Sequence, residues 1–344
     1  MGEPSFLETG KLPHRVLSRL LRRYGRTDDR VLVGPHIGED ATAIAPQRDV
    51  VVAGMDPITF ATDEIGWYVV HVNANDVAVM GAQPRWFLVT FLLPEGRTRL
   101  EDVEEMFEQV ARACEEVGAS LVGGHTEVTY DLKRPLAIGV MMGEVARDRL
   151  VRTGGARVGD TLILARGVPI EGTALIARER REDLLARGVP AEVVERAAGF
   201  LHDPGISVVR AALVAAEAGG VHAMHDPTEG GVLTGVWELA EASNVGVWMD
   251  GDAVVVLPEG RLLCDMYGLD PLGTIASGAL LIAADPAAAP RVLERLHGEA
   301  IPAAPIGHIL PLEEGRWLRR AGERVPLIPP PVDEIVKVFV GGEE

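Results

Sequence analysis

The stretch MHDPTEGGV, Met224–Val232, joins two elements of different kinds and decides the class of fold. The segment Val221–Met224 before it is typical of a short strand, and the apolar pattern of Val232–Ala242 after it is typical of a helix. A strand that passes directly into a helix is a building unit of domains that mix the two elements. The stretch therefore predicts an α/β arrangement in the second half of the chain.

The polar residues of this stretch permit two interpretations. Asp226, Pro227 and Glu229 stand where the N-cap, N1 and N3 residues of a helix are expected. Gly230 and Gly231 would each cost roughly 1 kcal/mol inside a helix. Glycine does, however, let backbone N–H groups approach a phosphate at a helix N-terminus. The stretch alone leaves a helix cap and a phosphate-binding turn equally open.

The rest of the chain mixes strands and helices without strict alternation, which favours two α/β or α+β domains over one doubly wound sheet. The content of glycine and of charged residues increases at Leu150–Asp160, which is typical of a domain boundary. We therefore predict domains at residues 1–155 and 156–344. The predicted strands are Val50–Ala53, Arg85–Leu93, Ser120–Val122 (ending at Gly123-Gly124), Leu136–Val145, Thr161–Ala165, Val221–Met224, Val245–Met249 and Ala279–Ala284. The predicted helices are His14–Tyr24, Gly66–Met80, Glu101–Val117, Thr173–Arg187, Ala191–Phe200, Ser207–Ala218, Val232–Ala242 and Arg291–His297.

Composition narrows the class of protein. A net charge of −18 over 344 residues would repel a polyanion, so we expect no nucleic-acid partner. No apolar run approaches the ~18–20 residues that span a bilayer, and the N-terminus does not resemble a signal peptide. We expect no membrane partner and a reduced, cytoplasmic location. Of the two cysteines, Cys114 lies on the apolar stripe of a helix and is interpreted as a core residue, as is Cys264.

Several carboxylates stand in turns beside glycine. Mg²⁺ takes oxygen ligands, usually a few carboxylates together with substrate phosphates, and glycines let backbone N–H groups approach those phosphates. The set therefore suits a Mg²⁺–nucleotide site built from many loops, although each residue alone is more typical of plain turn chemistry. These residues are Glu39, Asp40, Asp56, Asp63, Asp76, Glu127, Asp226 and Glu229.

Two further patterns bear on the kind of site. In the predicted helix Gly66–Met80, Asn73 and Asp76 share one face, which indicates either a solvated face or a functional one. His222 and His225 would point to opposite faces of a strand, so a transition-metal site is disfavoured. The chain has no GxxxxGK[ST], GxGxxG or HExxH motif, which disfavours a conventional kinase, dinucleotide enzyme or zinc protease.

Taken in order, the motifs resemble those of the ATP-dependent superfamily of aminoimidazole ribonucleotide (AIR) synthase. Other members are thiamine-monophosphate kinase, selenophosphate synthetase and the hydrogenase-maturation protein HypE, to which the pattern is most similar. Gly268–Ala284, GLDPLGTIASGALLIAA, also looks like the corresponding stretch of HypE. The motifs are GEDA at 38–41, the Asp56 segment, VNANDVAVMGAQP at 72–84, GGHTE at 123–127, GEV at 143–145 and DPTEGG at 226–231.

The resemblance implies a two-domain AIR-synthase-like (PurM-like) fold. Its N-terminal, strand-rich α/β domain would bind ATP and form a homodimer, and its C-terminal domain would be α/β. It implies ATP and Mg²⁺ as cofactors. The implied metal ligands are Asp40, Asp56, Asp76 and Asp226. The implied ATP and phosphate contacts are Gly38, Asn75, Gly123, Gly124, Thr126, Gly230 and Gly231, with His125, Glu127 and Glu229 as further candidates.

The chain departs from each named relative. HypE ends in a cysteine that is modified, whereas this sequence reads VGGEE at 340–344. In addition, HypE usually has Arg where Glu229 stands. No catalytic residue is assigned. The leading hypothesis is an enzyme that uses ATP and Mg²⁺ to phosphorylate and so activate an acceptor oxygen of a small molecule or a protein. The alternatives are a nucleotide-binding maturation partner that acts on another protein, and a small-molecule kinase like thiamine-monophosphate kinase.

Overall fold

The computed structural model describes residues 7, 10–11, 14–25, 29–33, 43–58 and 63–340. The chain divides into two compact units. Unit 1 comprises Met1–Ala78 and Ala82–Asp148, and unit 2 comprises Val79–Gly81 and Arg149–Glu344. The GEDA motif, with Gly38 and Asp40, lies outside the described residues.

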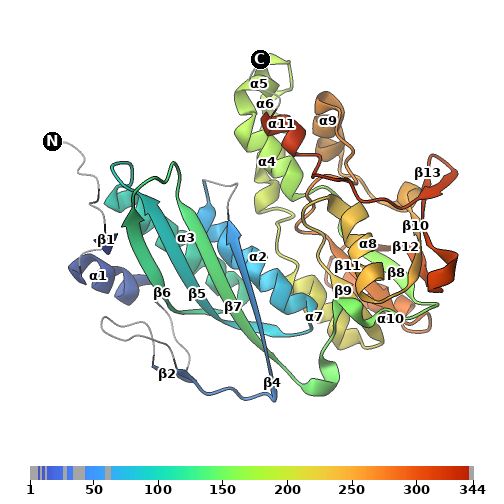
Figure 1. Ribbon diagram of the computed structural model, residues 1–344, viewed down its shortest axis with the longest axis horizontal. Helices are drawn as coiled ribbons and strands as arrows, with labels where there is room; N and C mark the ends of the chain where they lie inside the picture. Colours follow the sequence, from blue (N-terminus) through green and yellow to red (C-terminus); the bar gives the residue numbers. More distant parts are fainter. Residues whose placement is uncertain are drawn as a thin grey trace. The chain divides into compact units, whose positions relative to one another are not determined.

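Unit 1 is built on a sheet that, in the described part of the chain, has five strands in the order β1-β6-β5-β7-β4. Strands β5 and β6 are parallel, and the other neighbours are antiparallel. Figure 1 shows the long strands in front of two helices. The strands are β1 (Gly10–Lys11), β4 (Val50–Ile58), β5 (Gln83–Pro94), β6 (Ser120–Thr129) and β7 (Leu136–Val145), and β2 (Val31–Val33) pairs separately with β3 (Ala43–Ile44).

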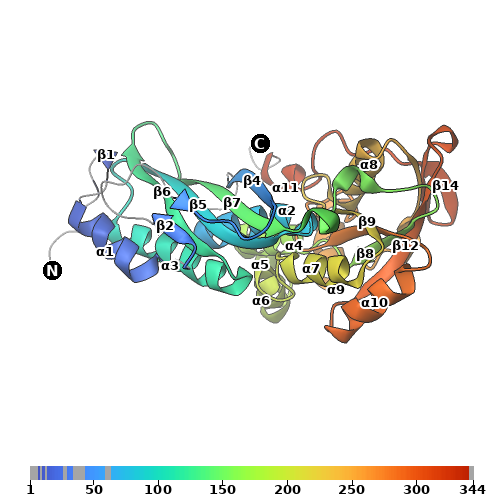
Figure 2. The same cartoon turned by 90° about the horizontal axis from the view of Figure 1, so that it is seen from below.

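Helices cover one face of this sheet. They are α1 (His14–Tyr24), α2 (Ile65–Val79) and α3 (Leu100–Val117), and α1 and α3 lie on the same side of the strands in Figure 2. Phe87 and Phe91 of β5 point to that side and are fully buried, and the Phe91 ring lies 5.7 Å from that of Phe107 on α3. Gly66 lets α2 approach α3 closely, because a Cβ there would lie 2.4 Å from the Met106 carbonyl oxygen. The alternating pattern of the strands thus buries one face under α2 and α3.

The prediction that a strand ends at Gly123-Gly124 is wrong. Strand β6 continues to Thr129, and Gly124 pairs with Val89 of β5. A Cβ at Gly124 would lie 2.0 Å from the Val89 carbonyl oxygen, and its φ is +148°. Glycine is therefore needed here for close strand pairing, which local sequence does not distinguish from a turn.

Unit 2 contains a mixed sheet with the order β14-β13-β10-β12-β8-β11-β9, seven strands within the described residues. Its central strands are apolar: Leu280–Ala284 is buried along its whole length. Among the strand pairs of this sheet that the structure describes, β10 and β13 are parallel and the others are antiparallel. The strands are β8 (Thr161–Ala165), β9 (Val221–His225), β10 (Gly246–Asp250), β11 (Leu280–Ala284), β12 (Ala303–Leu310), β13 (Arg316–Arg320) and β14 (Glu323–Pro326).

The helices of unit 2 surround this sheet and share its core. The predicted helix Thr173–Arg187 is two helices in the structure, because the backbone at Arg180 leaves the helical region. The helix predicted at Val232–Ala242 is confirmed as α8, with one more residue at its start. The helices are α4 (Glu171–Glu179), α5 (Arg181–Ala186), α6 (Ala191–Ala198), α7 (Val209–Ala218), α8 (Gly231–Ala242), α9 (Pro258–Tyr267), α10 (Ala289–Gly298) and α11 (Val336–Val340). None of the helices in the described residues is long and apolar enough to cross a membrane.

Candidate functional site

In unit 1, Asn73 connects helix α2 to strand β4 at Asp56. The Asn73 side-chain oxygen accepts a hydrogen bond of 2.8 Å from the Asp56 backbone N–H, and its Nδ2 donates to the Asp56 carbonyl at 3.2 Å and to the Val69 carbonyl at 2.8 Å. Gly139 on β7 leaves room for this amide, because a Cβ there would lie 2.6 Å from Nδ2. Asn73 is fully buried, so this face of α2 packs against β4 and is not solvated.

Asp76 lies one turn further along α2, beside the same strand. A Cβ at Gly54 would lie 3.2 Å from the Asp76 Cβ and 3.4 Å from its Oδ2. Gly54 and Asp56 are two residues apart on β4 and face the same side of the sheet. The structure therefore brings the half-buried carboxylates of Asp56 and Asp76 to one region of unit 1, as metal ligands require.

This donor set suits a magnesium ion that is completed by phosphate oxygens. The carboxylates are hard oxygen donors, and Mg²⁺ is usually held by one or two carboxylates and the phosphates of a substrate. Among the described residues, no group of three or more His, Cys, Asp or Glu side chains could hold a metal by itself. Asp40, the third candidate from this half of the chain, lies outside them. Asn75 is fully buried inside α2.

The candidates on β6 divide between the two faces of the sheet. Thr126 is buried, whereas His125 is exposed and Glu127 is partly exposed. The His125 Nε2 lies 3.3 Å from the Glu127 Oε2. Gly123 also adjoins β5, since a Cβ there would lie 3.2 Å from the Leu88 Cδ2. The structure thus places His125 and Glu127 together and turns Thr126 away from them.

The GEV motif contains a residue whose structural role the sequence did not reveal. Glu144 is buried on β7 and accepts hydrogen bonds from the backbone N–H groups of Gln47, at 2.5 Å, and Arg48, at 3.1 Å. Its carboxylate also pairs with Arg30. Burial alone would raise the pKa of Glu144, but these backbone bonds and Arg30 lower it below the usual value. Glu144 therefore fixes the segment that leads into β4.

In unit 2, the DPTEGG stretch is a turn that precedes the helix. Helix α8 begins at Gly231, and its N-cap is Gly230 in the left-handed conformation, with a φ of +75°. Asp226 is therefore not the N-cap residue. A Cβ at Gly231 would lie 2.5 Å from the Leu272 carbonyl oxygen, so close packing also requires glycine at this position. The helix-cap interpretation of Asp226 is wrong, because tertiary contacts start the helix four residues later than the local pattern indicates.

Within this turn Asp226 and Pro227 are buried, whereas Thr228 and Glu229 are exposed. Asp226 is 5% exposed and follows the end of β9. The two histidines of that strand have separate acidic partners: His222 Nδ1 lies 2.9 Å from the Asp160 Oδ1, and His225 Nε2 lies 2.9 Å from the Glu238 Oε2. Their positions are thus accounted for by pairwise contacts.

Two acids that were not candidates lie near Glu229. Glu171, the first residue of α4, is buried, and burial raises its pKa to about 7. A hydrogen bond with Ser277 lowers this pKa, whereas the negative charges of Asp333 and Glu229 raise it further. Asp333 is also buried, and its pKa is raised, first by burial. Asp333 stands 103 residues from Gly230 in sequence and binds its backbone N–H. Only the fold reveals this cluster, since nothing local marks Asp333 as a partner of the turn.

Comparison with known families defines the class of protein to which this architecture belongs. The family model "AIR synthase related protein, N-terminal domain" matches residues 28–145, and that of the C-terminal domain matches residues 157–316. The chain is therefore an AIR synthase-related protein, built of two mixed α/β units that each have their own sheet. This confirms the predicted fold class and the predicted family resemblance.

Comparison with individual relatives shows which family of this class the chain resembles. Carbamoyl dehydratase HypE of Rhizobium leguminosarum bv. viciae is 32% identical over 263 residues, which cover 74% of this chain and 71% of the relative. Carbamoyl dehydratase HypE of Cupriavidus necator is 32% identical over 274 residues, which cover 78% and 70%. A crystal structure of hydrogenase maturation protein HypE in complex with ATP is 25% identical, with a TM-score of 0.77 over 94% of this chain and 96% of that one. The chain belongs to the HypE family.

Proposed function

We propose that this protein is an ATP- and Mg²⁺-dependent enzyme of the HypE type. It would transfer a phosphoryl group from ATP to the oxygen of a carbamoyl or related amide group, release ADP and so activate that carbon–oxygen bond for loss of phosphate. The family relationship to carbamoyl dehydratases and to an ATP-bound HypE supports this reaction class. The observation that carries the proposal in this chain is the convergence of Asp56 and Asp76 on one face of unit 1.

The side chains of unit 1 would hold the metal and the phosphates. Asp56 and Asp76 would bind Mg²⁺ directly or through water, with Asn73 fixing the backbone at Asp56. The bound ion would neutralise charge on the transferring phosphoryl group, which is how such reactions are mainly catalysed. Asp40, Gly38, Asn75, Gly123, Gly124 and Thr126 remain proposed contacts from this half of the chain.

In unit 2, Asp226 and the turn formed by Gly230 and Gly231 remain proposed contacts of metal or phosphate. The N-terminus of a helix favours oxyanions, because its backbone N–H groups and its dipole both face them. In the structure, however, the Gly231 N–H donates to the Thr228 carbonyl at 3.0 Å, and the Gly230 N–H donates to Asp333. A phosphate could bind at Gly230 only if Asp333 moved away. His125, Glu127 and Glu229 are proposed only as residues near the bound substrate.

The acceptor is proposed to be a group other than the two cysteine thiols. The two cysteines in the sequence, Cys114 and Cys264, are both buried, and burial raises the pKa of each thiol. Neither can readily form the exposed thiolate that a covalently carried carbamoyl group would need. The proposed acceptors are therefore a small amide and a group on a protein, with neither Cys114 nor Cys264 as the carrier.

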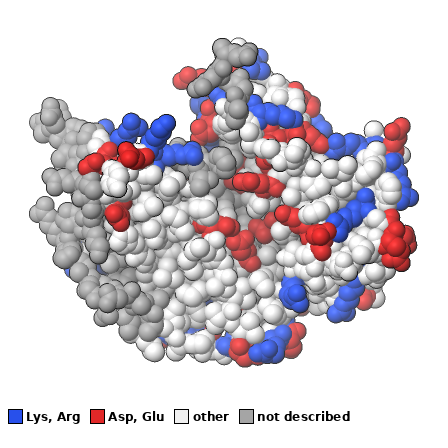
Figure 3. Space-filling view, viewed as in Figure 1, with Lys and Arg blue, Asp and Glu red and all other residues white. Residues whose placement is uncertain are grey.

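The enzyme is proposed to be a homodimer through unit 1. Its sheet has a second face, which the described helices leave open and which carries apolar side chains on neighbouring strands. Met55 of β4 is 65% exposed and pairs with Val140 of β7, which in turn pairs with Leu88 of β5. In Figure 3 the surface over these strands is largely white. A contiguous apolar face of this kind is typical of an interaction surface.

ADP release from purified protein tests the reaction class. The assay contains Mg-ATP with either a panel of small carbamoyl compounds or a carbamoylated partner protein. We expect ADP to form in proportion to the acceptor. Turnover with small acceptors supports the enzyme as stated, and turnover that requires a partner protein supports the alternative, a nucleotide-binding maturation partner. Absence of acceptor-dependent ADP under both conditions would contradict both.

A further inference from the structure

Unit 2 contains a cavity to which the proposed function assigns no role. Its volume is about 230 Å³, and all of its lining residues belong to unit 2. A cavity of about 150 Å³ inside a protein is enough to take up benzene. The cavity of unit 2 is therefore large enough for a small organic molecule somewhat larger than benzene.

One side of the cavity is apolar. Leu233 of α8 and Leu318 of β13 line it and are only 6% and 4% exposed, because both belong to the core of the unit. Val325 of β14 pairs with Leu318 in the antiparallel register of these two strands and also lines the cavity. This side therefore favours the apolar body of a ligand, since binding there removes apolar surface from water.

The C-terminal segment of residues 326–334 forms another side of the cavity. The Leu327 N–H donates a hydrogen bond of 3.1 Å to the Arg316 carbonyl, and the Glu334 N–H donates one of 3.3 Å to the Gly273 carbonyl. Three consecutive prolines between these two bonds restrict the backbone further. A wall that is fixed in this way lowers the entropic cost of binding a ligand. The lining residues of the segment are Pro326, Ile328, Pro330 and Glu334.

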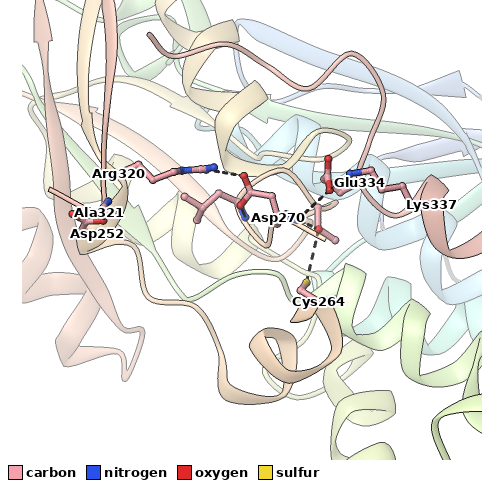
Figure 4. Close-up of polar contacts among 9 residues, drawn as sticks. Asp252, Cys264, Asp270, Arg320, Ala321, Glu334 and Lys337 are labelled. Atoms are coloured by element: carbon pink, nitrogen blue, oxygen red, sulfur yellow. Dashed lines mark hydrogen bonds and ion pairs between the residues drawn. The ribbon is translucent and has the colours of Figure 1, made fainter. Parts of the chain in front are cut away.

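The charged residues that line the cavity have a net negative charge. They are two carboxylates, Asp270 and Glu334, and one guanidinium, Arg320. The Arg320 Nη2 lies 2.7 Å from the Asp270 Oδ2, and Figure 4 shows this pair beside Glu334. Because Arg320 neutralises Asp270, Glu334 determines the charge of the cavity.

Glu334 keeps an acceptor that a ligand can use. Its Oε2 accepts hydrogen bonds from the Asp270 backbone N–H, at 3.1 Å, and from the Lys337 Nζ, at 2.5 Å, whereas its Oε1 accepts none within the described residues. Lys337 does not line the cavity, and its side chain is 58% exposed, so water screens its charge. The Glu334 side chain is itself only 14% exposed. A cation in the cavity would therefore replace solvation that this carboxylate lacks.

We propose that the cavity binds a small organic cation, an ammonium group attached to a compact apolar body. The ammonium group donates hydrogen bonds to Glu334, and the apolar body lies against Leu233 and Leu318. The net charge of −18 attracts such a ligand to the protein and repels an anion. The inference goes beyond the proposed function and does not depend on it, because every residue of the cavity belongs to unit 2.

Calorimetric titration of the wild-type protein with three probes of similar shape tests the charge preference. The probes are benzylamine, benzyl alcohol and benzoate, at neutral pH and without ATP. We expect benzylamine to bind at least about tenfold more tightly than benzyl alcohol, because a hydrogen bond between charged groups is stronger than one to a neutral donor. Benzoate should bind most weakly, since its carboxylate would approach Glu334. Equal affinities for the amine and the alcohol, or no binding of benzylamine, would overturn the proposal.

Two substitutions test the assignment of the ammonium contact to Glu334. Glu334→Gln removes the charge and keeps an oxygen that accepts from the Asp270 N–H. We expect this variant to lose about tenfold in affinity for benzylamine and to keep its affinity for benzyl alcohol. Glu323→Gln removes an exposed acid of β14 that does not line the cavity, and it should bind like wild type. Unchanged benzylamine affinity in a folded Glu334→Gln protein would overturn the assignment.

A change of volume tests the location independently of charge. Val325→Trp should fill the cavity from the edge strand β14 and abolish binding of both benzylamine and benzyl alcohol. Val255→Trp adds the same bulk at a residue of unit 2 that is 57% exposed and outside the cavity, and it should bind like wild type. Binding that persists in a folded Val325→Trp protein would overturn the proposal. Because none of these titrations contains ATP, failure of the proposal would leave the proposed function intact.

Discussion

Asn73 on α2 forms hydrogen bonds with both backbone groups of Asp56 on β4, so a single buried amide sets the position of a proposed metal ligand. A hydrogen bond of this kind contributes about 1 kcal/mol, and removal of the amide also leaves buried backbone groups unpaired. We therefore expect Asn73→Ala to lower the free energy of unfolding by roughly 2–4 kcal/mol. Urea denaturation measures this, with the exposed Gln47→Ala as control. A loss no larger than that of the control would show that the hydrogen bonds of Asn73 with Asp56 do not stabilise the folded protein.

Glu171 predicts a pH dependence of stability. Its folded-state pKa of about 7 lies above the ordinary value of 4.5, so the folded protein holds a proton that the unfolded chain releases. The associated stability is fully present below about pH 4.5 and is lost as pH rises through about 7. Glu171→Gln should therefore be more stable than wild type at pH 8.5, by roughly 2–3 kcal/mol, and similar to it at pH 5. Denaturant unfolding at the two pH values measures the difference, and a difference independent of pH would refute the assignment.

The open face of the unit 1 sheet predicts the oligomeric state. A charge placed at the exposed Met55 would be buried without a partner in a dimer that uses this face. We expect wild type to have the mass of a dimer and Met55→Glu that of a monomer, by light scattering at micromolar concentration. Ile328→Glu, at an equally exposed apolar residue of unit 2, is the control and should remain dimeric. A monomeric wild type would exclude the proposed assembly.

The thiols are predicted to be dispensable for chemistry. Cys114 is 3% exposed on the apolar stripe of α3, and burial raises the pKa of its thiol. Cys114→Ala should lower stability by about 1 kcal/mol, as expected for the loss of a small buried group, and keep ADP release within about twofold of wild type. A folded variant without activity would instead assign the thiol a covalent role.

Much of the fold could be predicted from local patterns. The strands β7 and β8 have the predicted bounds, and α3 begins within one residue of its prediction. These segments are governed by their own alternation or helical periodicity. By contrast, β6 passes through Gly123-Gly124 because of pairing with β5, and α8 starts at Gly231 because of contacts with residues 272–274. Local sequence cannot show contacts made at such separations.

The same distinction applies to the candidate site: local motifs predict some of its residues and do not reveal others. The motifs pointed to Asp56 and Asp76, which the structure brings to one face of unit 1. They did not point to Asn73 as the residue that positions Asp56, since its spacing suggested only a polar face. Asp333 and Glu171 were missed altogether. Each becomes recognisable only where a distant segment meets the DPTEGG turn, and an acid among ordinary acids carries no local signal.

The most direct test of the central claim is a calorimetric titration of Mg-ATP into wild type, Asp76→Asn and Asp131→Asn. Asp131 is exposed in a turn of unit 1 with a φ of +62°, which Asn tolerates, so the control removes the same charge without disturbing the fold. We predict that wild type and Asp131→Asn bind Mg-ATP alike, that omission of Mg²⁺ abolishes most of this binding, and that Asp76→Asn loses at least about tenfold in affinity, or ~1.4 kcal/mol. Mg-ATP binding that is unchanged in a folded Asp76→Asn protein, or no binding by wild type, would contradict the account.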